Sequence, residues 1–554
     1  MVGPKSTPKD SNEKVVPTQP FRILDAPYLR DDFYCSILAY SPTSGYLAVG
    51  LGCRVYLWCE ALGVQHPPFR EQHPSNYVTS LSFSSEDGGK SILAVGRRTG
   101  MLSLWNPLDT AVRFEISHPS PVTCVSFKPT KSRRPSKRFP GLEVDVEDLV
   151  VGDDRGNVWY YSVEWPDEEF EDRFDWSGAM TLLAKISAHT QQVCGLAWSP
   201  NEAYLATGGN DNSCLLFDLA EIIPSQESRC ASQASCSSQQ SQGTRCQSAF
   251  SCLTSNGGPG SAFNGKHLIS QLIPSWVHPP VKPPATSLLN DTGTLIAGGD
   301  QTILVPPNRQ KHRFIHSAAV KAIAFAPWQP SLLATGGGTN DRAIHFFHTL
   351  SGSCLATINV YAQVTSLIWS KTRREIVATF GFSQPEHPFR IAVFAWPSCE
   401  QVAAIPWGPD GSSWDGLTRN ELVDCGRALC AISYPGSPPY LRPEDYLLGH
   451  QERCSPEISS SMTPDGSNRD GRSPFPHARG PTVVQPKAKE GGLWCSRTME
   501  EGCIIVASSD QTVKFHEVWS GSGRKIATGS SPFGGSQILE GLEGIEMPGN
   551  EIIR

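Results

Sequence analysis

The sequence predicts an all-β protein: a seven-bladed β-propeller that carries long disordered insertions and flexible termini. Three observations predict this fold class. A strand–turn–strand phrase recurs seven times, the composition favours turns and aromatic packing, and the sequence between some repeats is of low complexity. The 554 residues include 49 Gly, 45 Pro and 14 Trp, whereas only 18% are charged, which favours turn-rich β structure over long helices.

The repeated phrase consists of an apolar strand, a turn, a second strand ending in small residues, a tight turn, and a third strand ending in an aromatic side chain. Its clearest copies are residues 193–217, VCGLAWSPNEAYLATGGNDNSCLLF, and residues 320–347. The seven copies have second-strand anchors at Leu47, Leu93, Leu149, Leu205, Leu333, Ile376 and Ile505. This phrase is typical of the WD40 repeat, which is about 40–45 residues long. Such a small sheet cannot bury both faces alone, so the blades are expected to stack radially.

The propeller is flanked and interrupted by segments of different composition. The expected divisions are a disordered N-terminus (1–19), the propeller (20–520) and a flexible tail (521–554). Insertions are expected at about 129–147, 221–310 and 435–500, and the last two are rich in Ser, Gly and Pro. Residues 294–305, TLIAGGDQTILV, form either an inserted hairpin or part of a blade. The extended segment at 20–27 is predicted to be the outer strand of the last blade.

Composition and motif content exclude several function classes. The net charge of −7 argues against a nucleic-acid partner, and no apolar run is long enough for a signal peptide or a membrane span. The 17 Cys are expected to be reduced and mostly buried. The sequence shows no metal-ligand spacing, phosphate loop or nucleophile motif, so no catalytic residue, metal or cofactor is expected. A basic run at 131–138 is either a nuclear-import signal or a solvated loop.

Several repeats carry a histidine and an aspartate at the positions that form a structural hydrogen bond in WD repeats. The aspartate precedes the third strand, and the histidine usually precedes the first. The expected pairs are His118 with Asp154, His189 with Asp211, and His316 with Asp341. In the last repeat Asp510 occupies the aspartate position, and His516 stands where the final aromatic of the strand is expected. Because the pair recurs with the repeat, we interpret it as structural and not catalytic.

Four phrases are more specific than a general WD repeat. They are FRILDAPYLRDDFY (21–34), LAVGLGCRVYLW (47–58), QQVCGLAWSPNEAYLATGGNDN (191–212) and AAVKAIAFAPWQPSLLATGGGTNDR (318–342). These phrases closely resemble the fizzy and fizzy-related family, the substrate-recruiting coactivators of a ubiquitin ligase, the anaphase-promoting complex. The resemblance implies a non-enzymatic adaptor that promotes ubiquitin-dependent proteolysis in the cell cycle, in the nucleus and cytoplasm. The large insertions and the divergent last blade are unlike the general mitotic members of this family and look more like its fungal meiosis-specific branch.

The resemblance also implies two peptide-reading surfaces. The residues matching the family's KEN-degron site are Asp32, Phe33, Asn210, Thr339, Gln363 and Arg427. In the destruction-box groove, between the first and last blades, Leu24 and Asp25 would meet the Leu and Arg of the degron. Gln511 stands where the family has an acidic residue, so weaker pairing with that Arg, or a variant motif, is expected.

The two ends of the chain differ in their match to the family. The C-terminal Ile553-Arg554 matches the tail that docks on a tetratricopeptide subunit of the ligase. The first 20 residues contain nothing like the C-box, the activating motif of the family. Two alternatives therefore stay open: a non-activating WD-repeat scaffold or an inhibitor of the same ligase, and an unrelated propeller adaptor.

Overall fold

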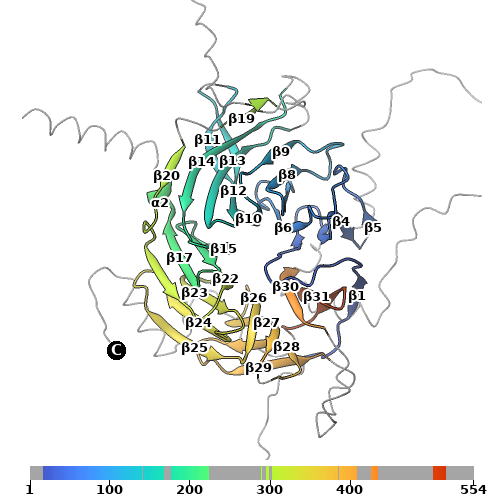
Figure 1. Cartoon of the computed structure of the whole chain (residues 1–554), viewed down its shortest axis with the longest axis vertical. Coiled ribbons are helices and arrows are strands. Elements are labelled where there is room, and N and C mark those ends of the chain that lie inside the picture. Colours follow the sequence, from blue (N-terminus) through green and yellow to red (C-terminus); the bar gives the residue numbers. More distant parts are fainter. Residues whose placement is uncertain are drawn as a thin grey trace, which may run out of the picture.

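The computed structural model describes residues 16–60, 62–139, 141–167, 176–223, 302–384, 386–407, 426–434 and 503–519, and the backbone of two short strands at 288–289 and 295–297. Within these residues the strands form seven sheets arranged as a ring (Figure 1). The predicted seven-bladed propeller is confirmed. Among the described helices, none has the length and apolar character needed to cross a membrane.

The first three blades follow the chain order. Blade 1 consists of β2 (Leu38–Tyr40), β3 (Leu47–Leu51), β4 (Arg54–Cys59) and β5 (Gly63–Gln65). Blade 2 consists of β6 (Val78–Phe83), β7 (Leu93–Arg97), β8 (Met101–Trp105) and β9 (Phe114–Ser117). Blade 3 consists of β10 (Val122–Phe127), β12 (Glu143–Asp153), β13 (Asn157–Glu164) and β14 (Ala179–Ser187).

The other four blades complete the ring. Blade 4 consists of β15 (Val193–Trp198), β16 (Tyr204–Gly209), β17 (Ser213–Asp218) and β21 (His312–Ile315), with the short helix α2 (Leu219–Ile222) after β17. Blade 5 consists of β22 (Val320–Ala326), β23 (Gln329–Gly337), β24 (Ala343–His348) and β25 (Cys354–Asn359). Blade 6 consists of β26 (Ala362–Trp369), β27 (Glu375–Ser383), β28 (Phe389–Ala395) and β29 (Gln401–Pro406). Blade 7 consists of β30 (Ala428–Tyr434), β31 (Cys503–Ser508), β32 (Thr512–His516) and β1 (Arg22–Asp25).

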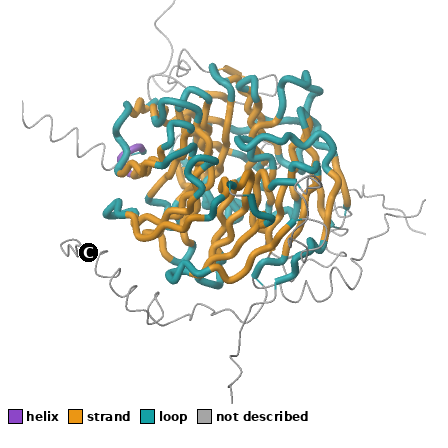
Figure 2. The backbone as a smooth tube through the Cα atoms, turned by 60° about the horizontal axis from the view of Figure 1, so that its bottom comes forward, coloured by secondary structure: helices purple, strands orange, loops and turns teal. Residues whose placement is uncertain are grey.

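The hydrophobic core lies between the blades. Second strands such as β7 and β16 are buried along their whole length, because each blade is covered on both faces by its neighbours. The core divides into seven apolar clusters, each built from two adjacent blades. Loops connect the stacked strands at the ends of the blades (Figure 2), which places loop residues from distant repeats side by side.

The ring closes through the N-terminal segment, as the sequence predicts. Strand β1 pairs antiparallel with β32, with Leu24 opposite Val513 and Asp25 opposite Thr512. Residues 16–19, expected to belong to a disordered terminus, are part of the described structure, and Val16 packs against the apolar cluster between blades 6 and 7. The last blade is therefore assembled from both ends of the described chain.

The strands described within residues 294–305 each pair with a blade, and they do not pair with one another. Strands β19 (Leu295–Ala297) and β20 (Ile303–Val305) both run parallel to β14 at the outer edge of blade 3. Strand β18 (Leu288–Leu289) pairs with β19. The insertion expected at 435–500 and the tail at 521–554 lie outside the described residues.

The insertion expected at 129–147 is an ordered hairpin. Its first strand, β11 (Ser132–Pro135), pairs with the beginning of β12, from Ser132 opposite Val146 to Pro135 opposite Glu143. Arg134 forms an ion pair with the buried Asp148. The basic run at 131–138 therefore contributes a strand, and is not simply a solvated loop.

The expected histidine–aspartate pairs form in blades 4 and 5. His189 Nδ1 lies 2.9 Å from Asp211 Oδ1, and its Nε2 lies 2.8 Å from Thr207 Oγ1. In blade 5 the His316–Asp341 pair has the same arrangement, and Thr335 takes the place of Thr207. Each pair ties the loop before a first strand to the turn before a third strand.

The third expected pair, between His118 and Asp154, is wrong. In blade 3 the neighbouring Asp153 accepts the hydrogen bond from Trp159 Nε1 at 3.0 Å, and Asp154 lies 3.8 Å from Arg98. His118 lies instead 3.4 Å from the Tyr161 hydroxyl.

In blade 7, Asp510 accepts hydrogen bonds from Lys514 and Thr512. His516 is fully buried and stacks on Trp407, and neither ring nitrogen has a hydrogen-bond partner among the described residues. Burial lowers the pKa of His516 to about 3, so the ring stays neutral.

Candidate peptide-binding site

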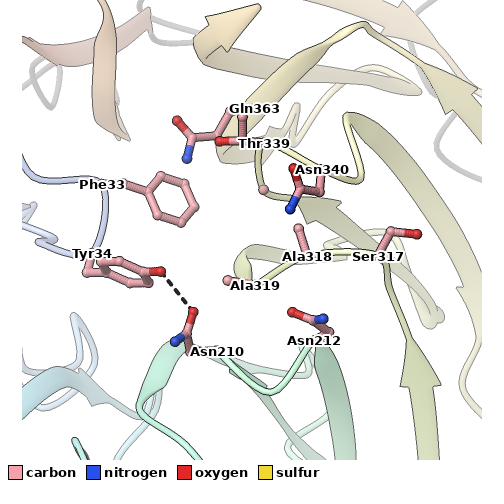
Figure 3. A pocket seen from close by; sticks show the side chains of 11 residues that line it. Phe33, Tyr34, Asn210, Asn212, Ser317, Ala318, Ala319, Thr339, Asn340 and Gln363 are labelled. Carbon is pink, nitrogen blue, oxygen red and sulfur yellow. Dashed lines mark hydrogen bonds between the residues drawn. The ribbon is translucent and has the colours of Figure 1, made fainter.

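A polar pocket of about 230 Å³ opens where loops of blades 4 and 5 and the first strand of blade 6 meet the segment that enters blade 1 (Figure 3). Its lining residues are Phe33, Tyr34, Asn210, Asn212, Ser317, Ala318, Ala319, Gly338, Thr339, Asn340 and Gln363. Four of the six residues expected at a KEN-degron site are among them: Phe33, Asn210, Thr339 and Gln363. Residues separated by more than 300 positions in the sequence therefore share one cavity.

Asn210 is held in a fixed orientation by two neighbours. The Tyr34 hydroxyl donates to Asn210 Oδ1 at 2.8 Å, and Asn210 Nδ2 donates to Gln191 Oε1 at 3.0 Å. Burial raises the pKa of Tyr34, so its hydroxyl remains protonated and can donate. Phe33 has no hydroxyl group, but the adjacent Tyr34 supplies one to the same pocket. Tyr34 is not among the residues expected from the sequence, although it adjoins the expected Phe33.

The side chain of Lys321 lies beneath the pocket. Its ammonium group is 5.3 Å from the centre of the Phe33 ring, and it donates to the carbonyl oxygens of Cys35 and Leu429 at 3.0 Å each. Burial lowers the pKa of Lys321. A single side chain of blade 5 thus contacts blade 7 and the segment before blade 1. A lysine inside the apolar phrase VKAIAF was a signal for such a role.

The wall formed by blade 5 is braced by Asp341. Its Oδ1 accepts a hydrogen bond from the Ser317 backbone N–H at 2.9 Å, and its Oδ2 lies 3.5 Å from His316 Nδ1. Burial would raise the pKa of Asp341, but hydrogen bonds from His316, His345 and Ser317 outweigh burial and hold the pKa well below its usual range. This carboxylate joins the loops that carry Ser317 and Thr339.

Asp32 and Arg427, the other two expected KEN-site residues, do not line the pocket. Asp32 Oδ1 accepts a hydrogen bond from the Tyr34 backbone N–H at 3.0 Å. Arg427 forms an ion pair with Asp31, and its guanidinium lies 4.2 Å from the centre of the Phe382 ring. Both residues therefore have partners within the protein.

The residues expected in the destruction-box groove come together at the seam between blades 7 and 1. Leu24 is half-buried against the apolar cluster of this seam, whereas Asp25 is exposed. Gln511 accepts two hydrogen bonds from the N-terminal segment: its backbone oxygen from Ala26 N–H at 2.8 Å, and its side-chain Oε1 from Tyr28 N–H at 3.3 Å. Gln511 thus fastens the seam. The expected ligase-docking residues Ile553 and Arg554 lie outside the described residues.

The sheet topology and repeated hydrogen-bond networks define a WD-repeat β-propeller with a polar loop pocket. In agreement, the family model "WD domain, G-beta repeat" matches residues 180–218, which cover most of blade 4 and the strand before it.

Proteins of similar sequence show which WD-repeat proteins this chain resembles. The chain is 26% identical to "Meiosis-specific APC/C activator protein AMA1" of Saccharomyces cerevisiae, over 97% of this chain and 64% of that protein. It is 27% identical to "Meiotic fizzy-related protein 2" of Schizosaccharomyces pombe, over 95% and 69%. An uncharacterized WD repeat-containing protein of Schizosaccharomyces pombe is 30% identical over 71% of this chain and 52% of its own length. The chain is therefore similar in sequence to proteins named as a meiotic APC/C activator and as a meiotic fizzy-related protein, and it spans about half to two thirds of the length of these relatives.

Proposed function

We propose that this protein is a substrate-recruiting coactivator of the anaphase-promoting complex, an adaptor that binds degron peptides and is not itself an enzyme. The observation that carries the proposal is the pocket, in which four residues expected to bind a KEN degron meet from four separate parts of the chain. Relatives named as an APC/C activator and as a fizzy-related protein support the same role. Because those relatives are named as meiotic, we extend the proposal to meiosis.

The chemistry of the pocket suits a polar peptide side chain. Asn210, Asn340 and Gln363 offer amide groups that both donate and accept hydrogen bonds, as recognition of an asparagine side chain requires. Phe33 adds an apolar surface on which the carbon chain of a ligand can pack. A volume of about 230 Å³ holds one or two side chains, so the pocket suits a short motif.

Two charged residues near the pocket suit the charged residues of a KEN motif. Asp32 would attract the lysine of a KEN motif, and Arg427 would attract its glutamate after exchanging its partner Asp31. This exchange replaces one exposed ion pair by another, which costs little free energy.

We further propose that Leu24 and Asp25 form part of a destruction-box groove, and that Ile553 and Arg554 dock on a tetratricopeptide subunit of the ligase. Asp25 is an exposed carboxylate at the seam, whereas Asp510 is already paired with Lys514. The seam therefore offers less negative charge to a degron arginine than two free acids would. We expect the protein in both the nucleus and the cytoplasm.

The first test is direct peptide binding. A fluorescent peptide containing Lys-Glu-Asn should bind the full chain, and Asn210→Ala should weaken binding about tenfold, because the amide group that would bond to the degron asparagine is lost. Fluorescence anisotropy measures both affinities, with a scrambled peptide as reference.

The matched control is Asn201→Ala. Asn201 is an exposed asparagine in the turn before β16, whereas Asn210 follows the opposite end of the same strand. Unchanged binding is expected for this control. Equal affinity for the scrambled peptide, or equal losses of affinity in the two variants, would show that this pocket does not bind the KEN motif.

A further inference from the structure

Blade 5 carries three metal-ligating side chains behind the wall of the pocket: His316, Asp341 and His345. Their ligand atoms lie within 4.8 Å of one another. Asp341 Oδ2 is 3.5 Å from His316 Nδ1 and 3.0 Å from His345 Nε2. The sequence does not predict this metal site, because these three residues do not form a contiguous ligand motif.

Comparison with blade 4 shows that one of the three residues is not needed by the WD network. In blade 4, His189, Asp211 and Thr207 form the same network as His316, Asp341 and Thr335. The position four residues after the aspartate is Leu215 in blade 4 and His345 in blade 5. His345 is therefore an additional ligand on an otherwise ordinary structural pair.

The geometry fits a tetrahedral transition-metal site. Zn²⁺ binds imidazole nitrogen and carboxylate oxygen at about 2.0–2.2 Å, which places neighbouring ligand atoms about 3.3–3.5 Å apart. The two distances to Asp341 Oδ2 bracket this range. Three protein ligands leave the fourth position for water or another ligand. The His345 side chain is 19% exposed, so an ion can approach from that side.

A second layer of polar groups supports the ligands. Thr335 Oγ1 lies 3.2 Å from His316 Nε2, and Thr357 Oγ1 lies 3.1 Å from His345 Nδ1. A hydroxyl group can accept a hydrogen bond from a ring N–H, which leaves the opposite nitrogen free to bind a metal. The Ser317 backbone N–H binds the other oxygen of Asp341. Each ligand thus has the partner that orients it in a metal site.

We propose that His316, Asp341 and His345 bind one divalent transition-metal ion, with Zn²⁺ as the chemically favoured ion. His316 directly precedes Ser317, and Asp341 directly follows Asn340, and both of these neighbours line the pocket. The ion would join these two loops and brace the pocket wall. This site does not depend on the proposed function, because it rests on side chains of blade 5 alone.

The test uses Co²⁺ and Zn²⁺ as probes on the full chain. Co²⁺ should give a visible d–d absorption without a thiolate charge-transfer band, which distinguishes this site from the cysteines. Zn²⁺ should abolish that absorption by competition. His345→Leu should lose it together with one bound Zn²⁺ per chain in a calorimetric titration. That substitution copies Leu215 of blade 4 and keeps the structural pair.

Two further variants test whether the His345 imidazole itself binds the ion. His345→Gln can still donate a hydrogen bond to Asp341 but lacks the imidazole, so it should also lose the ion. His73→Leu removes an exposed imidazole elsewhere and should leave the number of bound ions unchanged. The proposal is overturned if Co²⁺ gives no such absorption, or if the His345 variants retain the spectrum and the number of Zn²⁺ ions of the original chain. No peptide enters these measurements, so their failure is separate from a failure of the proposed function.

Discussion

A chain that lacks residues 1–26 should be far less stable than one that lacks only residues 1–15. The longer deletion removes β1, whose four residues pair with β32 and complete blade 7. It also removes the Arg22–Glu60 ion pair and the Phe21–Phe515 ring contact. The lost hydrogen bonds and apolar burial together amount to roughly 3 kcal/mol or more, and the bare edge of β32 favours aggregation.

Thermal unfolding followed by circular dichroism, with the soluble fraction after expression, measures this effect. A synthetic peptide of residues 16–27 added to the truncated chain should recover part of the lost stability, because it replaces the outer strand. Equal unfolding temperatures for the two truncated chains would show that the ring closes without β1.

Gly195→Ala should lower the free energy of unfolding by about 3 kcal/mol, a large effect for one methyl group. Gly195 lies in β15 of blade 4, and a Cβ atom there would stand 2.2 Å from the backbone oxygen of Lys321 in blade 5. A backbone atom cannot turn aside as a side chain can, so the two blades must separate. The added methyl group would also displace the Lys321 ammonium from Cys35 and Leu429.

The control for this prediction is Gly63→Ala. Gly63 has a positive φ of 68° but nothing within 4 Å of the added Cβ. Backbone strain alone should therefore cost about 1 kcal/mol. Chemical denaturation of both variants measures the difference, and a Gly195→Ala variant no less stable than Gly63→Ala would contradict close packing of the inner strands.

The blades were predictable because each repeat carries the same pattern of apolar residues, which are buried between neighbouring blades. Leu47, Leu205 and Ile505 come from different repeats, yet all are fully buried in second strands. The outer strand β1 was predictable as well, because the last repeat supplied only three strands. Both conclusions depend on local patterns that each repeat carries by itself.

Features that depend on contacts between distant segments were not predictable. In blade 3 the aspartate that accepts the hydrogen bond from Trp159 is Asp153, one residue before the expected Asp154. In blade 7, Lys514 donates a hydrogen bond to the carboxylate of Asp510, and His516 stacks on Trp407. Strands β19 and β20 lie far from β14 in the sequence, so nothing local shows that they extend its sheet.

The candidate site was predicted in part. Resemblance to the fizzy and fizzy-related family identified Phe33, Asn210, Thr339 and Gln363, which do line one pocket. It could not show that Arg427 is paired with Asp31, or that Tyr34 holds Asn210. Those contacts follow from how the segment before blade 1 lies across the loops of the other blades.

A reconstituted ubiquitination assay tests whether the protein acts as a coactivator of the anaphase-promoting complex. Full chain, anaphase-promoting complex and a KEN-bearing substrate are combined, and ubiquitinated substrate is measured beside the Asn210→Ala variant and a chain without Ile553-Arg554. We expect a several-fold increase in ubiquitinated substrate with the full chain and loss of most of this increase in both variants. No increase from a full chain that still binds the KEN peptide would contradict the coactivator role and favour an inhibitor or a non-activating scaffold.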